Sequence, residues 1–151
     1  MKLLVVAHEL APTGPVVQLV ELARRWRAMG WKISVLSRGR GTCRAELERL
    51  GCEVGETFNV KEYDLALVLT AVQARRVVEL APHVRTVFAI HEGHAFVGNF
   101  KGAPDTLAAA FRAAHRILFV HEFQRDILFR PFLLALRIRA LRGSEWVKRG
   151  G

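Results

Sequence analysis

The chain has 151 residues, 51% of them hydrophobic, which suits one domain with a single well-filled core. Its formal net charge is +9, but residues 130–151 contain six basic residues and one acidic residue, so residues 1–129 carry an excess of only +4. We therefore expect no nucleic-acid partner for the folded body, and no apolar run is long enough to suggest a signal-peptide core or a membrane span.

Apolar runs of strand length alternate with helical patterns along the chain, which is typical of a parallel sheet covered by helices on both faces. The runs are almost wholly apolar, as expected of buried parallel strands. We predict strands at residues 3–7, 32–36, 64–70, 86–90 and 116–120, with a short edge strand at 53–54. The predicted fold class is α/β, a Rossmann-like three-layer sandwich with a mostly parallel sheet.

The first predicted helix lies between the first two strands. Its apolar face is formed by Val16, Leu19, Val20, Ala23 and Trp26, which recur at helical spacing. Pro15 suits its first turn, and Gly30 suits a left-handed position after its end. Further helices are predicted at 44–50, stopped by Gly51, and at 72–80 and 105–114, with a long loop over 91–103.

Polar residues follow four of the predicted strands, at the edge of the sheet where ligands of parallel α/β folds bind. They are His8 and Glu9, Thr70, His91 and Glu92, and His121 and Glu122. Three His-Glu pairs should therefore converge on one rim. One alternative is purely structural, because polar residues also occur wherever a buried strand reaches water. A second is a metal site, because His and Glu can bind zinc or iron. Adjacent His-Glu pairs lack the spacing of known two-histidine metal motifs, however, so we assign no metal ligands. A third interpretation is a polyol site, because imidazoles and carboxylates supply both donors and acceptors to sugar hydroxyls.

Gly14 stands directly before the first helix, where a glycine lets backbone N–H groups approach an anion. A purely structural N-cap role is an equal alternative. The stretch Ala11-Pro12-Thr13-Gly14-Pro15 is not a GxGxxG fingerprint, and the second strand ends at Ser37-Arg38 with no acidic residue, so we expect no NAD site and no bound cofactor. Cys43 and Cys52 match neither a metal spacing nor a disulfide framework, which favours reduced thiols and a cytoplasmic location.

Four segments between Met1 and about Phe132 resemble the N-terminal domain of the GT-B retaining glycosyltransferases of family 4. They are HELAPTGPVVQLVELARRWRAMGWKISVLS, DLALVLT, TVFAIHEG and ILFVHEFQRDIL. The resemblance implies an acceptor-side domain over residues 1–132 that takes part in sugar transfer from a nucleotide-sugar donor to an acceptor. A separate donor-binding domain or chain would then be required, because nothing in the sequence matches the second domain of that family.

The resemblance also implies roles for individual residues. His91 and Glu92 would be catalytic, with His91 positioning the transferred sugar. Residues implied to bind the donor or substrate are His8, Glu9, Thr13, Gly14, Thr70, Gly93, Glu122, Gln124 and Arg125. Retaining transfer by these enzymes needs no obvious protein nucleophile, since positioning and stabilisation of the leaving phosphate provide much of the catalysis.

Residues 133–151 form a basic tail in which leucines alternate with arginines. The tail could be a final helix packed on the domain, or an amphipathic helix in peripheral contact with the inner membrane face. An alternative function is accordingly a non-catalytic Rossmann-like binding or scaffold module with a membrane-associating tail.

Overall fold

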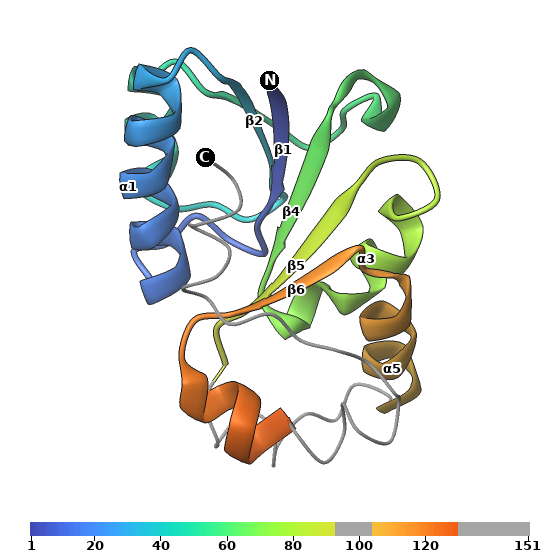
Figure 1. Cartoon of the computed structure of the whole chain (residues 1–151). Coiled ribbons are helices and arrows are strands. Elements are labelled where there is room, and N and C mark those ends of the chain that lie inside the picture. The colour runs from blue at the N-terminus through green and yellow to red at the C-terminus, as the bar shows by residue number, and fades with distance from the viewer. Residues whose placement is uncertain (93–103, 130–151) are drawn as a thin grey trace.

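Six strands form one sheet in the order β3-β2-β1-β4-β5-β6, and every neighbouring pair is parallel. The structure is a computed structural model, shown in Figure 1, and it describes residues 1–92 and 104–129. The chain runs outward from β1 through β2 to β3, then crosses back to β4 and runs the other way. The strand order therefore reverses between β1 and β4, as in the Rossmann-like folds.

The elements have the following bounds. The strands are β1 Lys2–Val6, β2 Lys32–Leu36, β3 Glu53–Gly55, β4 Leu65–Leu69, β5 Thr86–Ile90 and β6 Arg116–Phe119. The α-helices are α1 Gly14–Ala28, α2 Cys43–Arg49, α3 Ala74–Leu80 and α5 Pro104–Ala113. Two short 3₁₀ turns are η1 Val60–Glu62 and η2 Ala71–Gln73, and η3 Gln124–Phe129 is a π-helical turn.

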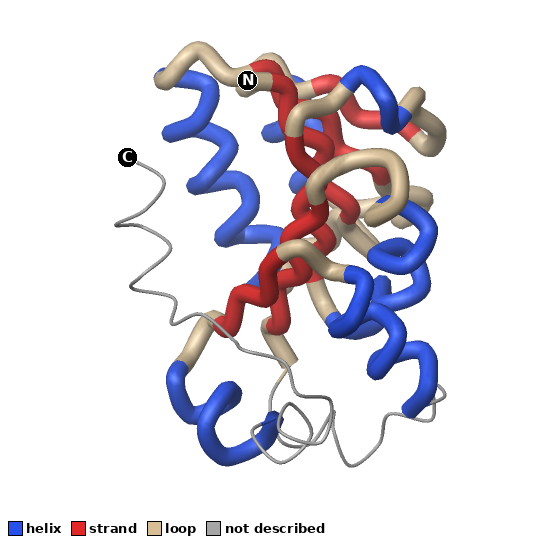
Figure 2. The backbone as a smooth tube through the Cα atoms, turned by 45° about the vertical axis from the view of Figure 1, so that its right-hand side comes forward, coloured by secondary structure: helices blue, strands red, loops and turns tan. Residues whose placement is uncertain are grey.

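Helices cover both faces of the sheet, with α1 on one side and α3 and α5 on the other (Figures 1 and 2). Alternate residues of each strand point to opposite faces. Leu3 and Val5 of β1 thus join the core beneath α1 and α2, whereas Leu4 and Val6 join the core beneath α3 and α5. The second core includes a group of phenylalanine rings, with Phe88 and Phe111 centred 5.6 Å apart.

The α/β fold class and all six strands are confirmed, and the strands predicted at 32–36 and 86–90 have the predicted bounds. Gly30 and Gly51 both have a φ of +79°, the left-handed conformation that ends a helix without steric cost at glycine. The helix predicted at 72–80 differs, because η2 precedes α3 there. The backbone of Thr70 has turned to a positive φ just before it, so a regular helix begins only at Ala74.

Cys43 and Cys52 are free, and both are buried. No helix within residues 1–92 and 104–129 is long and apolar enough to cross a membrane. Gly93, most of the predicted 91–103 loop and the basic tail over 133–151 lie outside the described residues, so the boundary near residue 132 and the role of the tail stay predictions.

Candidate functional site

The carboxyl ends of all six strands lie at one edge of the sheet, because the strands are parallel. Ligands of open α/β sheets bind at this edge, where the strand order reverses. Here the reversal lies between β1 and β4, so the segments after these two strands, with the segment after β2, are the first place to look for a site.

The three His-Glu pairs share this edge, but they follow β1, β5 and β6, which are not all neighbours. At about 4.8 Å per strand, the end of β5 lies roughly 10 Å from the end of β1, and the end of β6 roughly 14 Å. His8 and Glu92 nevertheless line the same cavity, described below, whereas His91 and His121 do not. The pairs are therefore spread along the rim and do not form one cluster.

Two glycines allow the segment after β2 to pass directly against the segment after β1. A Cβ atom on Gly39 would lie 2.4 Å from Cα of Glu9, and one on Gly41 would lie 1.9 Å from the carbonyl carbon of Leu10. Both contacts are with backbone, so neither could be relieved by moving a side chain. The N–H of Cys43 also donates to the carbonyl oxygen of Leu10 at 3.1 Å. Glycine is thus required where the two loops cross.

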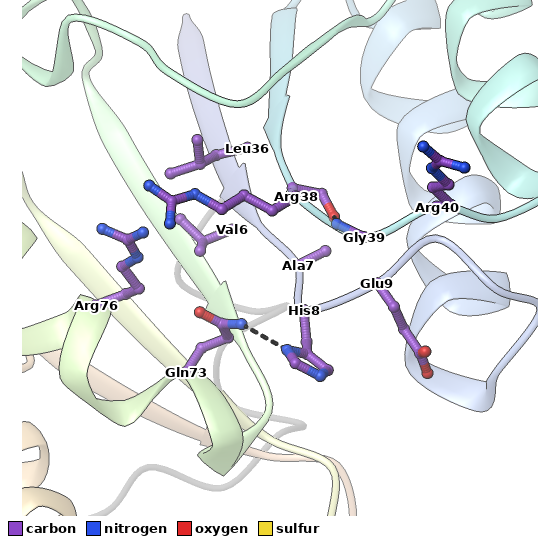
Figure 3. A pocket seen from close by; sticks show the side chains of 11 residues that line it. Val6, Ala7, His8, Glu9, Leu36, Arg38, Gly39, Arg40, Gln73 and Arg76 are labelled. Carbon is purple, nitrogen blue, oxygen red and sulfur yellow. Dashed lines mark hydrogen bonds between the residues drawn. The ribbon is translucent and has the colours of Figure 1, made fainter.

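A cavity of about 420 Å³ lies between the ends of β1 and β2 and the start of α3; we call it the basic pocket (Figure 3). Its charged lining groups are three guanidinium groups, from Arg38, Arg40 and Arg76, and one carboxylate, from Glu9. Its size falls within the range of small-molecule sites. The excess of positive charge favours an anionic ligand.

His8 and Gln73 connect the two sides of the basic pocket. The side-chain amide nitrogen of Gln73 lies 3.2 Å from Nδ1 of His8 (Figure 3). An amide nitrogen can only donate, so Nδ1 is the acceptor in this contact and the hydrogen of a neutral ring sits on Nε2. His8 is exposed, which leaves its Nε2–H available to a ligand.

A second cavity, of about 210 Å³, lies over the reversal point between β1 and β4; we call it the inner pocket. Its lining includes Thr70 and Glu92, and it shares Ala7, His8 and Glu9 with the basic pocket. The two pockets are therefore adjacent parts of one crevice.

Thr70 has φ 74° and ψ 145°, and it is the one residue other than glycine with a positive φ in the described parts of the chain. This conformation is a genuine outlier for a β-branched residue and costs about 1–3 kcal/mol. Its Oγ1 atom is also buried without a hydrogen-bond partner among the described residues. Thr70 is thus strained and unsatisfied where it lines the inner pocket.

Glu92 binds the backbone just after this strained residue and the backbone just after β5. Its Oε1 accepts the N–H of Ala71 at 2.5 Å, and its Oε2 accepts the N–H of His91 at 3.1 Å. Burial raises the pKa of the Glu92 carboxyl above its usual value, while these backbone donors act in the opposite direction. Glu92 therefore links the ends of β4 and β5.

Gln124 extends this link to β6. Its amide nitrogen donates to the carbonyl oxygen of Glu92 at 2.9 Å, and its amide oxygen accepts the N–H of His121 at 2.9 Å. Both ends of the buried Gln124 side chain thus form hydrogen bonds with the backbone.

Burial lowers the pKa of His91, which favours the neutral imidazole.

The remaining predicted site residues lie at different depths. Thr13 is exposed and lines the inner pocket, and a Cβ on Gly14 would have no atom within 4 Å. Glu122 is exposed, and Arg125 forms an ion pair with Asp126. Neither Glu122 nor Arg125 lines the two pockets, and the ligand roles predicted for all four residues stay predictions.

Across residues 1–92 and 104–129, no three His, Cys, Asp or Glu side chains are grouped so that they could hold a metal ion. No protein-family model and no curated protein matches the chain. Among solved structures, it is similar to the crystal structure of Synechocystis arogenate dehydrogenase, with a TM-score of 0.46 and 16% sequence identity. The match covers 94% of this chain and 59% of that one, so the chain spans well under two thirds of its length.

The predicted membership of the GT-B retaining glycosyltransferases of family 4 is wrong on these comparisons. No family model matches, and the solved structure described above is an arogenate dehydrogenase and not a GT-B glycosyltransferase. The physical reason lies in the four segments that carried the resemblance. Each is an apolar strand followed by polar residues or a helix, and every Rossmann-like sheet repeats this unit.

The prediction from sequence missed Arg38, Gln73 and Arg76 as members of the site. Arg38 is the second residue after the end of β2, as His8 is after the end of β1, so the same edge rule that selected His8 would have selected it. Gln73 and Arg76 lie one turn apart at the start of a helix, and only the folded chain brings them opposite Arg38.

The loop crossing yields a stability prediction. We expect Gly41→Ala to lower the free energy of unfolding by about 1–3 kcal/mol, because the added Cβ overlaps the Leu10 backbone. Gly14→Ala is the matched control, with open space around its Cβ, and should change stability by no more than about 0.5 kcal/mol. Urea unfolding of both variants measures the difference, and equal effects would contradict the crossing.

The buried carboxyl of Glu92 yields a pH-dependent prediction. We expect Glu92→Gln to lower the free energy of unfolding by up to about 1–2 kcal/mol at acid pH and by less at higher pH, because the buried wild-type carboxyl ionises at a cost and the amide does not ionise. The raised pKa of folded Glu92 means that protonation favours the folded state. The excess free energy of unfolding of wild type over Glu92→Gln should therefore be greatest below the pKa of Glu92 in the unfolded state. It should shrink as pH rises through the raised pKa of the folded state. Unfolding curves over a pH series test this, and a pH-independent difference would contradict desolvation of the carboxyl.

Proposed function

We propose that this chain binds a nucleotide sugar, or a closely related phosphorylated and hydroxyl-rich small molecule, in the crevice formed by the basic and inner pockets. The shared wall of Ala7, His8 and Glu9 supports one ligand extending through both. The crevice also lies at the reversal of strand order, which is where ligands bind in sheets of this kind.

Thr70 is the observation that carries this proposal. A strained backbone at a β-branched residue persists only where the surrounding structure imposes it, and such residues cluster at ligand sites. A buried hydroxyl that has no hydrogen-bond partner within residues 1–92 and 104–129 calls for an explanation in the same way. A ligand hydroxyl in the inner pocket would supply the missing hydrogen bond after a shift of the groups that now cover the buried Oγ1.

The wall of the inner pocket is mostly apolar and carries a few polar groups, so the C–H groups of a sugar could pack on the wall while its hydroxyl groups meet those polar groups. The Nε2–H of His8 can donate to a ligand hydroxyl, and the carboxyl of Glu92 lines the same pocket. Thr70 can both donate and accept. Such a mixed set is what a ring with several hydroxyl groups requires.

Transfer of the sugar to an acceptor stays a prediction. The crevice is lined from one chain, and the proposal for binding does not depend on the reaction. Contributions from a further domain or chain, and a catalytic role for His91 beside Glu92, are extensions of the same proposal.

Thr70→Val tests the proposal, because valine keeps the shape and β-branching of threonine but lacks the hydroxyl. We expect the variant to bind UDP-glucose about 3- to 10-fold more weakly, since one hydrogen bond to the ligand is lost. Its free energy of unfolding should stay equal or rise by about 1 kcal/mol, because a buried unsatisfied group is removed. Calorimetric titration and urea unfolding measure the two effects.

Thr70→Ser is the control, as it keeps the hydroxyl and should retain most of the affinity. Misfolding of Thr70→Val would lower both its affinity for UDP-glucose and its free energy of unfolding. It therefore cannot explain a lower affinity with an equal or higher free energy of unfolding. The proposal would be contradicted if Thr70→Val bound UDP-glucose with unchanged affinity, or if wild type did not bind UDP-glucose.

A further inference from the structure

The segment after β2 is held so that Arg38 faces the crevice. The N–H of Gly39 donates to Oγ of the buried Ser37 at 3.2 Å, and Gly39 itself lies against the backbone of Glu9. Figure 3 shows the Arg38 side chain extending past Val6 and Leu36 toward Arg76. Arg40 points away from them in the same view.

Arg76 approaches from the opposite side, on the first turn of α3. One of its terminal nitrogens donates to Oε2 of Glu79 at 2.8 Å, and Oε1 of Glu79 accepts from Arg75 at 3.0 Å. A single carboxylate thus serves two guanidinium groups, which leaves positive charge at Arg76 and fixes its position. Within residues 1–92 and 104–129, Arg76 makes no other side-chain hydrogen bond, and it lines the basic pocket.

Two guanidinium groups facing one cavity repel each other unless an anion lies between them. Within residues 1–92 and 104–129, Arg38 forms no ion pair with an acidic side chain. The Glu9 carboxylate, which shares the cavity, points away from Arg38 in Figure 3. The charge between Arg38 and Arg76 is therefore left for a ligand to balance.

The start of α1, which the sequence suggested for a phosphate, is a poorer place for one. The N–H groups of Val16 and Val17 both donate to the carbonyl oxygen of Thr13, and Pro15 has no N–H. The first turn thus has few free donors at Gly14. Guanidinium groups, in contrast, bind phosphoryl oxygens in pairs.

We propose that Arg38 and Arg76 form a clamp for the diphosphate of the ligand, so that its phosphoryl oxygens lie over the end of β2 and not at the start of α1. This placement rests on the proposed function for the identity of the ligand. His8 and Gln73 stand between the clamp and the inner pocket, where the sugar would lie.

Inorganic pyrophosphate is the probe, titrated calorimetrically into the full chain at low ionic strength. Loss of charge-assisted hydrogen bonds should make Arg38→Ala and Arg76→Ala each bind about 10- to 100-fold more weakly. Arg76→Lys should fall between wild type and Arg76→Ala, because lysine keeps the charge without the planar fork.

Arg75→Ala is the matched control. Arg75 neighbours Arg76, shares Glu79 with it and does not line the pocket, so its loss should leave pyrophosphate affinity within about twofold. Unchanged affinity in Arg38→Ala and Arg76→Ala would overturn the clamp in favour of another anion site such as Gly14. An equal drop in Arg75→Ala would also overturn it, as that would indicate only general charge attraction.

Thr70→Val separates this inference from the proposed function. It should leave pyrophosphate binding unchanged while weakening UDP-glucose binding. Arginine-dependent pyrophosphate binding without any UDP-glucose binding would uphold an anion clamp and refute the nucleotide sugar. Sensitivity of UDP-glucose binding to Thr70 but not to Arg38 or Arg76 would refute the clamp alone.

Discussion

The common direction of all six strands is the constraint on which the remaining structure depends. Parallel pairing places every carboxyl end at one edge, and the reversal between β1 and β4 separates the segments that follow these two strands. The crevice forms in that gap. Its walls come from loops that are distant in sequence, and their positions depend on a sheet buried on both faces.

The edge of this sheet is maintained at a cost in free energy. Thr70 adopts a conformation that disfavours its side chain, and its hydroxyl lacks a partner among the described residues. The Glu92 carboxylate holds the turn by accepting the N–H of Ala71, and Gln124 ties Glu92 to the segment after β6. Several strands thus support one unfavourable residue, which is the arrangement expected of a preorganised ligand site.

The resemblance to a glycosyltransferase family and the confirmed fold arise from the same residues. Apolar strands that end in polar side chains identify a parallel α/β sheet reliably, because burial on both faces requires apolar runs and the exit to water requires polar ends. This physical requirement is shared by unrelated proteins of the fold. It therefore carries information on where a ligand binds and little on which family the chain belongs to.

Sequence patterns alone predicted the order of strands and helices, the glycines at helix ends, and the edge at which a site should lie. These features depend on local periodicity and on backbone preferences such as the positive φ of Gly30. Which edge residues meet became clear only from the folded chain. It placed Arg76 opposite Arg38, joined Gln73 to His8, and made Glu92 a backbone acceptor beneath Thr70. Such contacts depend on the order of strands across the sheet and on the close crossing at Gly39 and Gly41, and no local pattern in the chain encodes them.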